Sequence, residues 1–476
     1  MAACAVGAGK SAYAEDVTVR FATFNASLNR NSLGELAADL DLPSALSVDL
    51  TQRYANSADV SGLSSSQREV LQIHNVAEIL QKINADVLLV NEFDYDEYGV
   101  AGTSSSSQPL GYSSLSAQRF QSNYLSVVHG GADTGRDATS PLYYQYAYTP
   151  ATNTGLASGL DLDNNGTIGG GNDAFGFGNF AGQYGFTLYS KYEITAVRTF
   201  QTFLWKDMPD NLLTSDPSPD ATNLANYYSA DEIEQLRLSS KNHVDITVNI
   251  DGQEVHFLAA HPTPPVFDGV EDRNGKRNAD EIRFWADYIN GGDQAAYIYD
   301  DNGLAGGLAA GSIFVIAGDY NADPNDGDSF ANAISQLLSD PLINVSFTPE
   351  SPGGTLAAVD PDNNGNTNAS HIGDPRFDTG DFNDAAPGNL RVDYVLPSSN
   401  VDMLGGGVFW PTEADADRPL VGEFGQPGLF SGMPSSDHKA VFVDVAIPQP
   451  VPVPAALPLL ASALGLLSAR RRCRRA

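Results

Sequence analysis

The stretch SIFVIAGDYNADP, residues 312–324, constrains both the fold and the chemistry of this chain. Its run of five apolar residues, rich in β-branched types, predicts a fully buried strand. The glycine that follows lets the backbone turn or approach a ligand closely, and the closing proline excludes a continuing strand. Alternation sends Asp319 and Asn321 to one side of the strand end, where a carboxylate and an amide can orient a water and hold a phosphoryl oxygen. An Asx-rich turn that only closes a core strand explains the same residues equally well.

Two earlier strands are predicted to end in similar polar residues. Residues 16–25 (DVTVRFATFN) alternate apolar and polar side chains and end at Asn25. Residues 67–84 carry apolar side chains at helical spacing, and the following run, 86–93 (DVLLVNEF), predicts a buried strand that carries Glu92. This strand–helix–strand order therefore places Asn25 and Glu92 at two strand ends.

The other elements follow from periodicity and turn residues. From residue 94 to about 180 the chain is rich in serine, glycine and asparagine with little periodicity, which predicts long surface loops. The remaining expected elements are a strand and turn over 186–197, a hairpin of strands 243–250 and 254–260, helices over 279–290 and 329–339, and strands over 391–396 and 440–446.

Composition indicates a globular and strongly acidic protein. The 476 residues are 42% hydrophobic and 18% charged, and the formal net charge is −33. Such a charge weighs against tight, non-specific binding of duplex DNA, because that binding depends on lysine and arginine neutralising phosphates. It suits a metal-loaded enzyme, a salty environment or a small phosphorylated substrate, and acidity that serves solubility alone explains it as well.

Both ends of the chain are typical of processed segments. Residues 1–14 are small and apolar and end in an A-x-A pattern, as the remnant of a signal peptide does, which leaves 15–447 as the functional domain. Residues 448–476 combine a Pro/Val spacer, fifteen apolar residues and an arginine cluster. Fifteen apolar residues are short for a stable membrane span, although flanking arginines can snorkel, and a permanent single-span anchor remains the alternative. Cys4 and Cys473, the two cysteines, lie in these segments, so the mature chain is expected to lack thiols.

The C-terminal segment resembles the PEP-CTERM/VPLPA class of bacterial sorting tails. That resemblance implies an exported protein, located outside the cell, on its surface or in the periplasm. It also implies a transient partner, the sorting machinery of the inner membrane, where the tail is embedded before processing.

Polar residues at the predicted strand ends form an ordered series. The pieces are Asn25 in TFNAS, Glu92 in NEF, Lys191 in YSKYEI, His261 in AAHPTPP, Asp319 and Asn321 in GDYN, Asp393 in RVDYVL, and Asp437 and His438 in SSDH. The series resembles the endonuclease/exonuclease/phosphatase superfamily, which includes DNase I-like nucleases, abasic-site endonucleases, sphingomyelinases and inositol-polyphosphate phosphatases. Each piece is weak alone, but together and in order they are specific. The resemblance implies an α+β fold, a four-layer α/β/β/α sandwich of two packed mixed sheets flanked by helices.

The resemblance also implies roles for these residues. Asp319 would orient or deprotonate the attacking water, and Asn321 would contact the phosphoryl oxygens. His261 and His438 would donate hydrogen bonds to the scissile phosphate, and Asp393 would fix the tautomer of His438. A turn residue, an ion-pair partner and a capping histidine are the structural alternatives for Asn25, Asp393 and His261.

Hydrolysis of a phosphate ester needs a cation, and Glu92, with Asn25 and Asp437 nearby, supplies hard oxygen ligands suited to Mg²⁺ or Mn²⁺. Lys241 and Lys191 are candidate contacts to the substrate. Asp161, Asp163 and Asn165 match the first half of a calcium loop, but the glutamate at position 12 is absent, so a structural Ca²⁺ competes with a plain turn. The charged segment 261–288 is either a salt-bridged loop over the site or a reader of the substrate.

The sequence therefore predicts an exported, monomeric, metal-dependent phosphoesterase. A phosphodiesterase or nuclease is the first activity, which leaves nucleic acid among the candidate substrates. A phosphomonoesterase for a small metabolite is the alternative within the enzyme class. A surface or matrix protein that kept the fold without catalysis is the alternative outside it, against which the complete set of polar residues argues.

Overall fold

The computed structural model describes residues 15–41, 63–95, 114–219, 222–359, 366–422, 424 and 434–450. The predicted signal-peptide remnant and nearly all of the sorting tail lie outside these ranges. Within them, none of the helices combines the length and the apolar character that crossing a bilayer requires.

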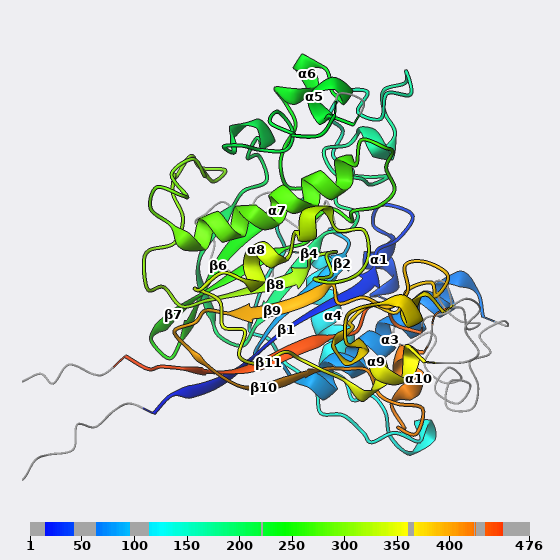
Figure 1. Cartoon of the computed structure of the whole chain (residues 1–476). Coiled ribbons are helices and arrows are strands. Elements are labelled where there is room, and N and C mark those ends of the chain that lie inside the picture. The colour runs from blue at the N-terminus through cyan, green and yellow to red at the C-terminus, as the bar shows by residue number, and fades with distance from the viewer. Residues whose placement is uncertain are drawn as a thin grey trace, which may run out of the picture.

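In the described part of the chain, eleven strands form two mixed sheets, whose arrangement is shown in Figure 1. The first sheet has the order β10 (Asp402–Val408), β11 (Val441–Ile447), β1 (Val17–Leu28), β2 (Val87–Phe93), β4 (Phe186–Ser190) and β3 (Tyr146–Tyr148). The second has the order β5 (Glu193–Thr199), β6 (His243–Ile250), β7 (Gln253–Ala260), β8 (Phe314–Asp319) and β9 (Asp393–Pro397). Each sheet contains one parallel pair, β1 with β2 and β7 with β8, among antiparallel neighbours.

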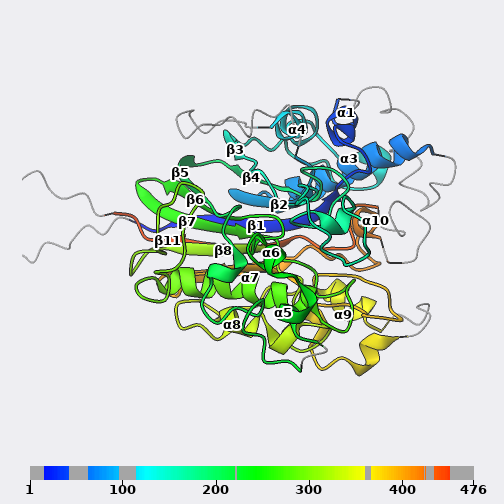
Figure 2. The same cartoon turned by 90° about the horizontal axis from the view of Figure 1, so that it is seen from above.

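Helices cover the outer faces of both sheets, as Figure 2 shows. One side carries α1 (Glu35–Asp39), α3 (Ser65–Ile83) and α4 (Leu115–Phe120), and the other carries α7 (Arg273–Asn290) and α8 (Ser335–Leu338). The remaining short helices are α5 (Leu224–Tyr227), α6 (Ala230–Ile233), α9 (Pro352–Ala357) and α10 (Arg418–Val421). The predicted α+β four-layer sandwich is confirmed.

Alternation along β8 explains how one strand serves two layers. Val315 and Ala317 belong to the core between the sheets, whereas Phe314 and Ile316 belong to the core under α7. Across the inter-sheet core, the ring of Phe21 on β1 stacks on that of Phe257 on β7 with centroids 6.3 Å apart. Both faces of β8 are thus buried, as its unbroken apolar run predicts.

Local signals set the bounds of the long helices. Ser64 and Gln67 form a capping box at the start of α3, which ends at Asn84 in a left-handed conformation. Helix α7 begins at Arg273, six residues before the expected start, because its first turns are polar and lack apolar periodicity. Lys276 holds these turns in place through a buried ion pair with Asp216, 2.6 Å long.

Several sequence-based expectations were wrong in detail. Segment 94–180 is not all surface loop, since α4, β3 and buried side chains such as Tyr124 and Tyr144 belong to the main core. Its elements are too short to show periodicity. The strand expected over 186–197 is two strands in different sheets, and β10 was missed because three successive glycines, 405–407, conceal it. The helix expected over 329–339 is broken at Ala331, where φ is 50°.

Candidate active site

The carboxyl ends of parallel strands meet at one edge of each sheet, and the packed sheets bring the two edges together. β1 and β2 place Asn25 and Asn91 side by side, one residue before Glu92. β8 and β9 pair Asp319 with Asp393 directly. This packing brings together residues nearly 300 positions apart. The side-chain amide of Asn25 donates to Asp319 across the two sheets.

Asp319 is the centre of this group and is 1% exposed. Its Oδ2 accepts a hydrogen bond from Asn25 Nδ2 at 3.0 Å and lies 3.4 Å from Nε2 of His261 and 3.6 Å from Nε2 of His438. Its Oδ1 accepts from the backbone N–H of Asn321 at 2.9 Å. Burial raises the pKa of Asp319 to about 6, the charge of Asp393 adds to this rise, and His438 opposes it. Four predicted site residues thus contact one carboxylate.

The two histidines beside Asp319 differ in charge. Burial disfavours the charged form of His438, but Asp393 and Asp319 outweigh it and hold the pKa of His438 well above its usual value. Asp393 Oδ2 lies 2.8 Å from His438 Nδ1. For His261, burial comes first and the positive Lys241 and His438 add to it, so its pKa is well below the usual value. At neutral pH, His438 is therefore charged and His261 neutral.

Glu92 ends β2 among further polar side chains. Its two oxygens accept hydrogen bonds from Asn25 at 3.1 Å and from Asn29 at 2.6 Å. Burial raises the pKa of Glu92, and Asp437 and Asp319 push it in the same direction. Glu92 has a φ of 54°, a left-handed conformation that is uncommon outside glycine. Such strain persists where the surrounding fold determines the side-chain position.

These acids fit a hard divalent cation. The ligand atoms of Asp319, Asp393 and His438 lie within 4.8 Å of one another. Among the described residues, Asp393 Oδ1 is buried without a hydrogen-bond partner, and the hydrogen bonds to Glu92 come from the neutral side chains of Asn25 and Asn29. Several buried carboxylates that repel one another and share one charged histidine form a donor set that a metal ion stabilises. The site can thus hold a metal.

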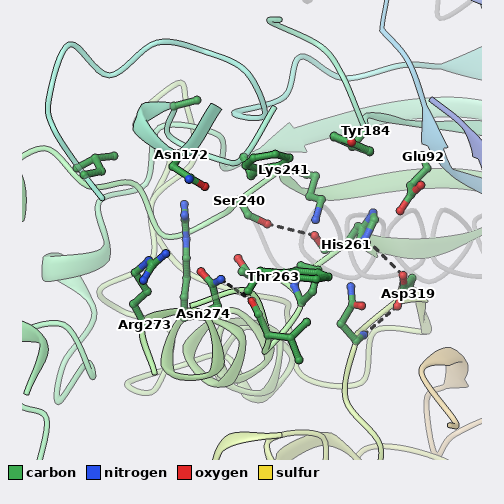
Figure 3. Close-up of a pocket in the computed structure, with 18 of the residues that line it drawn as sticks. Glu92, Asn172, Tyr184, Ser240, Lys241, His261, Thr263, Arg273, Asn274 and Asp319 are labelled. Atoms are coloured by element: carbon green, nitrogen blue, oxygen red, sulfur yellow. Dashed lines mark hydrogen bonds and ion pairs between the residues drawn. The ribbon is translucent and has the colours of Figure 1, made fainter. Parts of the chain in front are cut away.

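A cavity of about 630 Å³ opens onto this group (Figure 3). Glu92, His261 and Asp319 lie at one end, and Arg273 and Asn274 at the other. Its volume is in the range of small-molecule sites.

The sequence matches the Endonuclease/Exonuclease/phosphatase family over residues 22–438. The chain belongs to this family. No curated protein matches it. Similar solved structures include an endonuclease/exonuclease/phosphatase from Beutenbergia cavernae DSM 12333, 16% identical, with a TM-score of 0.41 over 92% of this chain and 73% of that chain. Others are sphingomyelinase C from Streptomyces griseocarneus (14% identical, TM-score 0.35, 90% and 99% covered) and truncated Caenorhabditis elegans TDP2 (12%, 0.34, 90% and 97%).

The two lysines predicted to contact substrate have different positions. Lys241 is buried in the cavity wall, and its Nζ lies 3.5 Å from the carbonyl of Pro262. Lys191 does not join the site, and that prediction was wrong. β4 runs antiparallel to β2, so the end of β4 lies beside the start of β2, where Lys191 Nζ lies 3.1 Å from Asp86 Oδ1. Lys191 is thus at the opposite end of the sheet from Glu92.

Segment 261–288 is a salt-bridged loop beside the site, and its reading of the substrate stays a prediction. Arg273 pairs with Glu271, and Arg277 donates to the carbonyls of Leu238, Phe175 and Arg237. Residues of the same segment, Thr263 and Pro264 among them, also line the cavity. The charged residues therefore brace a loop that forms one wall of the cavity.

The predicted metal ligands differ in how they present their atoms. Asp437 approaches Ser27 and Ser436 through Oδ1, at 3.4 Å from each hydroxyl. Asn25 donates its amide N–H to Glu92 and Asp319, while its oxygen accepts from the backbone of Ser27 at 3.2 Å. Its place among the metal ligands therefore stays a prediction.

The segment that matches half of a calcium loop is a compact turn. Asp161 and Asp163 come together with Asp173, their ligand atoms within 4.8 Å of one another. The side chain of Asn165 instead accepts from the backbone of Thr167 at 2.8 Å. Calcium at this turn stays a prediction.

Sequence reasoning missed Asn29 and Ser436. Asn29 lies four residues after Asn25 in FNASLN and contacts Glu92 only because β1 continues to Leu28. Ser436 accepts from the backbone of His438 at 3.1 Å and donates to the carbonyl of Asn25 at 2.7 Å. The serine pair before Asp437 was the available signal.

Proposed function

We propose that this chain is an exported, divalent-metal-dependent phosphoesterase that acts first on phosphodiesters. The observation that carries the proposal is the carboxylate of Asp319 between a neutral His261 and a charged His438, beside Glu92. A base, a cationic donor and further acids that can hold a metal ion are the parts that hydrolysis of a phosphate ester requires.

Each residue has a task that follows from its surroundings. Asp319, whose pKa is raised to about 6, is ionised at neutral pH and basic enough to orient and accept a proton from a water. His438 donates from Nε2 to a phosphoryl oxygen, while Asp393 holds Nδ1 and supports the positive charge. Lys241 and Asn321 offer further donors from the cavity wall. Mg²⁺ or Mn²⁺, held by Glu92 and Asp437, would neutralise phosphate charge when bound.

The cavity favours a small phosphodiester or a chain end over the middle of a duplex. About 630 Å³ holds a drug-sized ligand, and the net charge of −33 repels long polyanions. The same acidity favours the second candidate, a phosphomonoesterase for a small phosphorylated metabolite. A non-catalytic protein with this fold has no reason to keep the buried Asp393–His438 pair, which costs desolvation.

The test is hydrolysis by the purified chain of bis-p-nitrophenyl phosphate, nicked DNA, RNA, p-nitrophenyl phosphate and inositol phosphates. We expect a diester to react fastest, chelation to abolish activity, and Mg²⁺ or Mn²⁺ to restore it. Glu92→Gln should weaken metal binding in a protein that stays folded. Full activity in excess EDTA would overturn the proposal.

Export is proposed from the two terminal segments, with the mature, monomeric protein outside the cell, on its surface or in the periplasm. Their composition is the support, since both resemble segments that are removed. Intact-mass measurement on the exported protein should show a start near Glu15 and no cysteine. A mass that still includes Cys473 would contradict processing of the tail.

A further inference from the structure

The cavity continues from the catalytic group into an aromatic wall. Tyr184 lies beside Glu92 in Figure 3, and the charge of Glu92 adds to burial in raising the pKa of Tyr184. The ring of Phe177 follows, its centroid 6.3 Å from that of Tyr184 at an interplanar angle of 33°. Phe267 completes the wall. Phe177 and Phe267 are 55% and 88% exposed, so both rings are accessible to a ligand and neither is packed in a core.

The backbone under two of these rings is strained. Among the described residues other than glycine, the aromatic ones with positive φ are Tyr184, at 57°, and Phe267, at 67°, and both line this cavity. A left-handed conformation is a genuine outlier for a bulky side chain and persists only where its surroundings impose it. Two such outliers in one cavity indicate that the surrounding fold imposes these ring positions in spite of the backbone strain.

Hydrogen bonds hold both strained turns. Asn274 brackets Phe267, because its side chain donates to the carbonyl of Val266 at 2.7 Å and its backbone N–H donates to Asp268 at 2.7 Å. The backbone N–H of Tyr184 donates to Asp94 at 3.0 Å. The fold therefore fixes an almost fully exposed phenylalanine at the cavity, although that ring adds little to the core.

We propose that Tyr184, Phe177 and Phe267 form an aromatic subsite that holds a planar ring carried by the phosphoester substrate. This inference rests on the proposed function and names its substrate class. Ring faces attract rings in offset or tilted stacks more than they attract alkyl groups of equal area. Thr263 Oγ1, buried in the cavity wall with no hydrogen-bond partner among the described residues, can bond a polar ring edge. A nucleobase and a simple aryl group share this chemistry.

Binding of non-hydrolysable phosphonates in the presence of Mg²⁺ tests the subsite directly by calorimetry. Four ligands separate the contributions to affinity. Methylphosphonate tests the charged group alone, and cyclohexylphosphonate adds apolar bulk. Phenylphosphonate adds an aryl ring, and a nucleoside phosphonate adds a base. We expect phenyl to bind more tightly than cyclohexyl. Phe177→Ala and Phe267→Ala should each weaken binding of the ring ligands about five-fold or more and leave methylphosphonate unchanged. Tyr143→Ala is the control, since Tyr143 is 63% exposed and lies outside the cavity lining.

Phe267→Gly separates a ligand-binding role from a structural one. Glycine adopts a φ of 67° without strain, so this variant should melt at the same or a higher temperature while it loses the preference for rings. Equal losses of affinity for phenylphosphonate and cyclohexylphosphonate in these variants would mean that the subsite binds any apolar group, and the assignment to planar rings would be overturned. Unchanged ring binding in both alanine variants would overturn the subsite, even if the wild type hydrolyses diesters. No hydrolysis of any ester with either metal would instead overturn the proposed function.

Discussion

Two groups of three acidic or histidine side chains in this molecule look alike as sets of ligands and differ in what surrounds them. In each, the ligand atoms lie within 4.8 Å of one another: Asp319, Asp393 and His438 in the group proposed to be catalytic (the catalytic group), and Asp161, Asp163 and Asp173 in the loop group. The loop carboxylates accept backbone N–H groups of their own turn, such as that of Gly166 to Asp161 at 2.9 Å. The catalytic carboxylates are buried on two strands.

The difference appears in their proton affinities. Burial opposes ionisation of Asp173, but the N–H groups of Gly170, Gly169 and Leu162 outweigh it, and the pKa of Asp173 is lowered. For Asp319, burial dominates and the pKa rises to about 6. A turn whose N–H groups satisfy its own acids stabilises their charge. The buried strands give Asp319 too few donors to offset burial, so its charge stays costly and available for chemistry. Proximity alone therefore does not identify a catalytic site.

The largest expected effect separates the two groups by activity. Asp319→Asn removes the proposed base and should lower kcat on the best substrate by about 10³-fold or more. Asp161→Asn makes the same chemical change in the loop group and should alter kcat less than about two-fold, because it touches no reacting atom. Steady-state rates with circular dichroism as a folding check decide the matter. Equal losses in the two variants would remove the distinction between the groups.

A second test asks whether the catalytic group acts as a unit. Asp393→Asn and His438→Ala should each lower kcat about 10²-fold, because Asp393 supports the charge that His438 presents to the phosphate. The double variant should be far less impaired than the product of the singles. Fully multiplicative losses at saturating Mg²⁺ would make Asp393 an ordinary structural partner.

The two lysines extend the comparison to the ends of one sheet. Lys241→Met removes a buried donor from the cavity and should raise KM or lower kcat about ten-fold. Lys191→Met should leave both unchanged and cost less than about 1 kcal/mol of stability, since its ion pair with Asp86 is partly exposed. A loss of activity in the Lys191 variant would contradict its position at the far end of the sheet.

How far sequence alone predicted this site depends on the range of the interactions. The strand ends that carry Asn25, Glu92 and Asp319 follow from local apolar runs, and the order of the motifs gave the fold. Lys191 was misplaced because strand direction in a sheet is a tertiary property that its own motif does not contain. Predicting the contact of Asn29 needed the exact length of β1, and predicting that His261 is neutral while His438 is charged needed the position of Lys241 beside His261. Local patterns thus predicted the elements, and only packing set the chemistry.

The smallest expected effect is also the sharpest test. The same change, aspartate to asparagine, should alter the free energy of unfolding in opposite directions in the two groups. The folded-state pKa of Asp319 is raised from 3.8 to about 6, so the native protein loses stability as pH rises through that window, and at neutral pH the buried charge is a cost. Asp319→Asn should therefore raise the free energy of unfolding by on the order of 1 to 3 kcal/mol in EDTA.

Asp173 has the opposite sign. Its folded-state pKa is lowered, so its contribution is present above the unfolded-state pKa and is lost as pH falls through the folded-state pKa. Asp173→Asn should cost about 1 to 2 kcal/mol at neutral pH, because the charged acceptor of three backbone N–H groups is gone.

Denaturant unfolding of both variants and the wild type, at neutral pH and again near pH 4, measures the two signs. At the acidic end the gain from Asp319→Asn should shrink, since the wild-type carboxyl is then protonated in the native state. Stabilisation by both substitutions, or by neither, would mean that the two groups hold their charges in the same way, and the distinction drawn from their surroundings would fail.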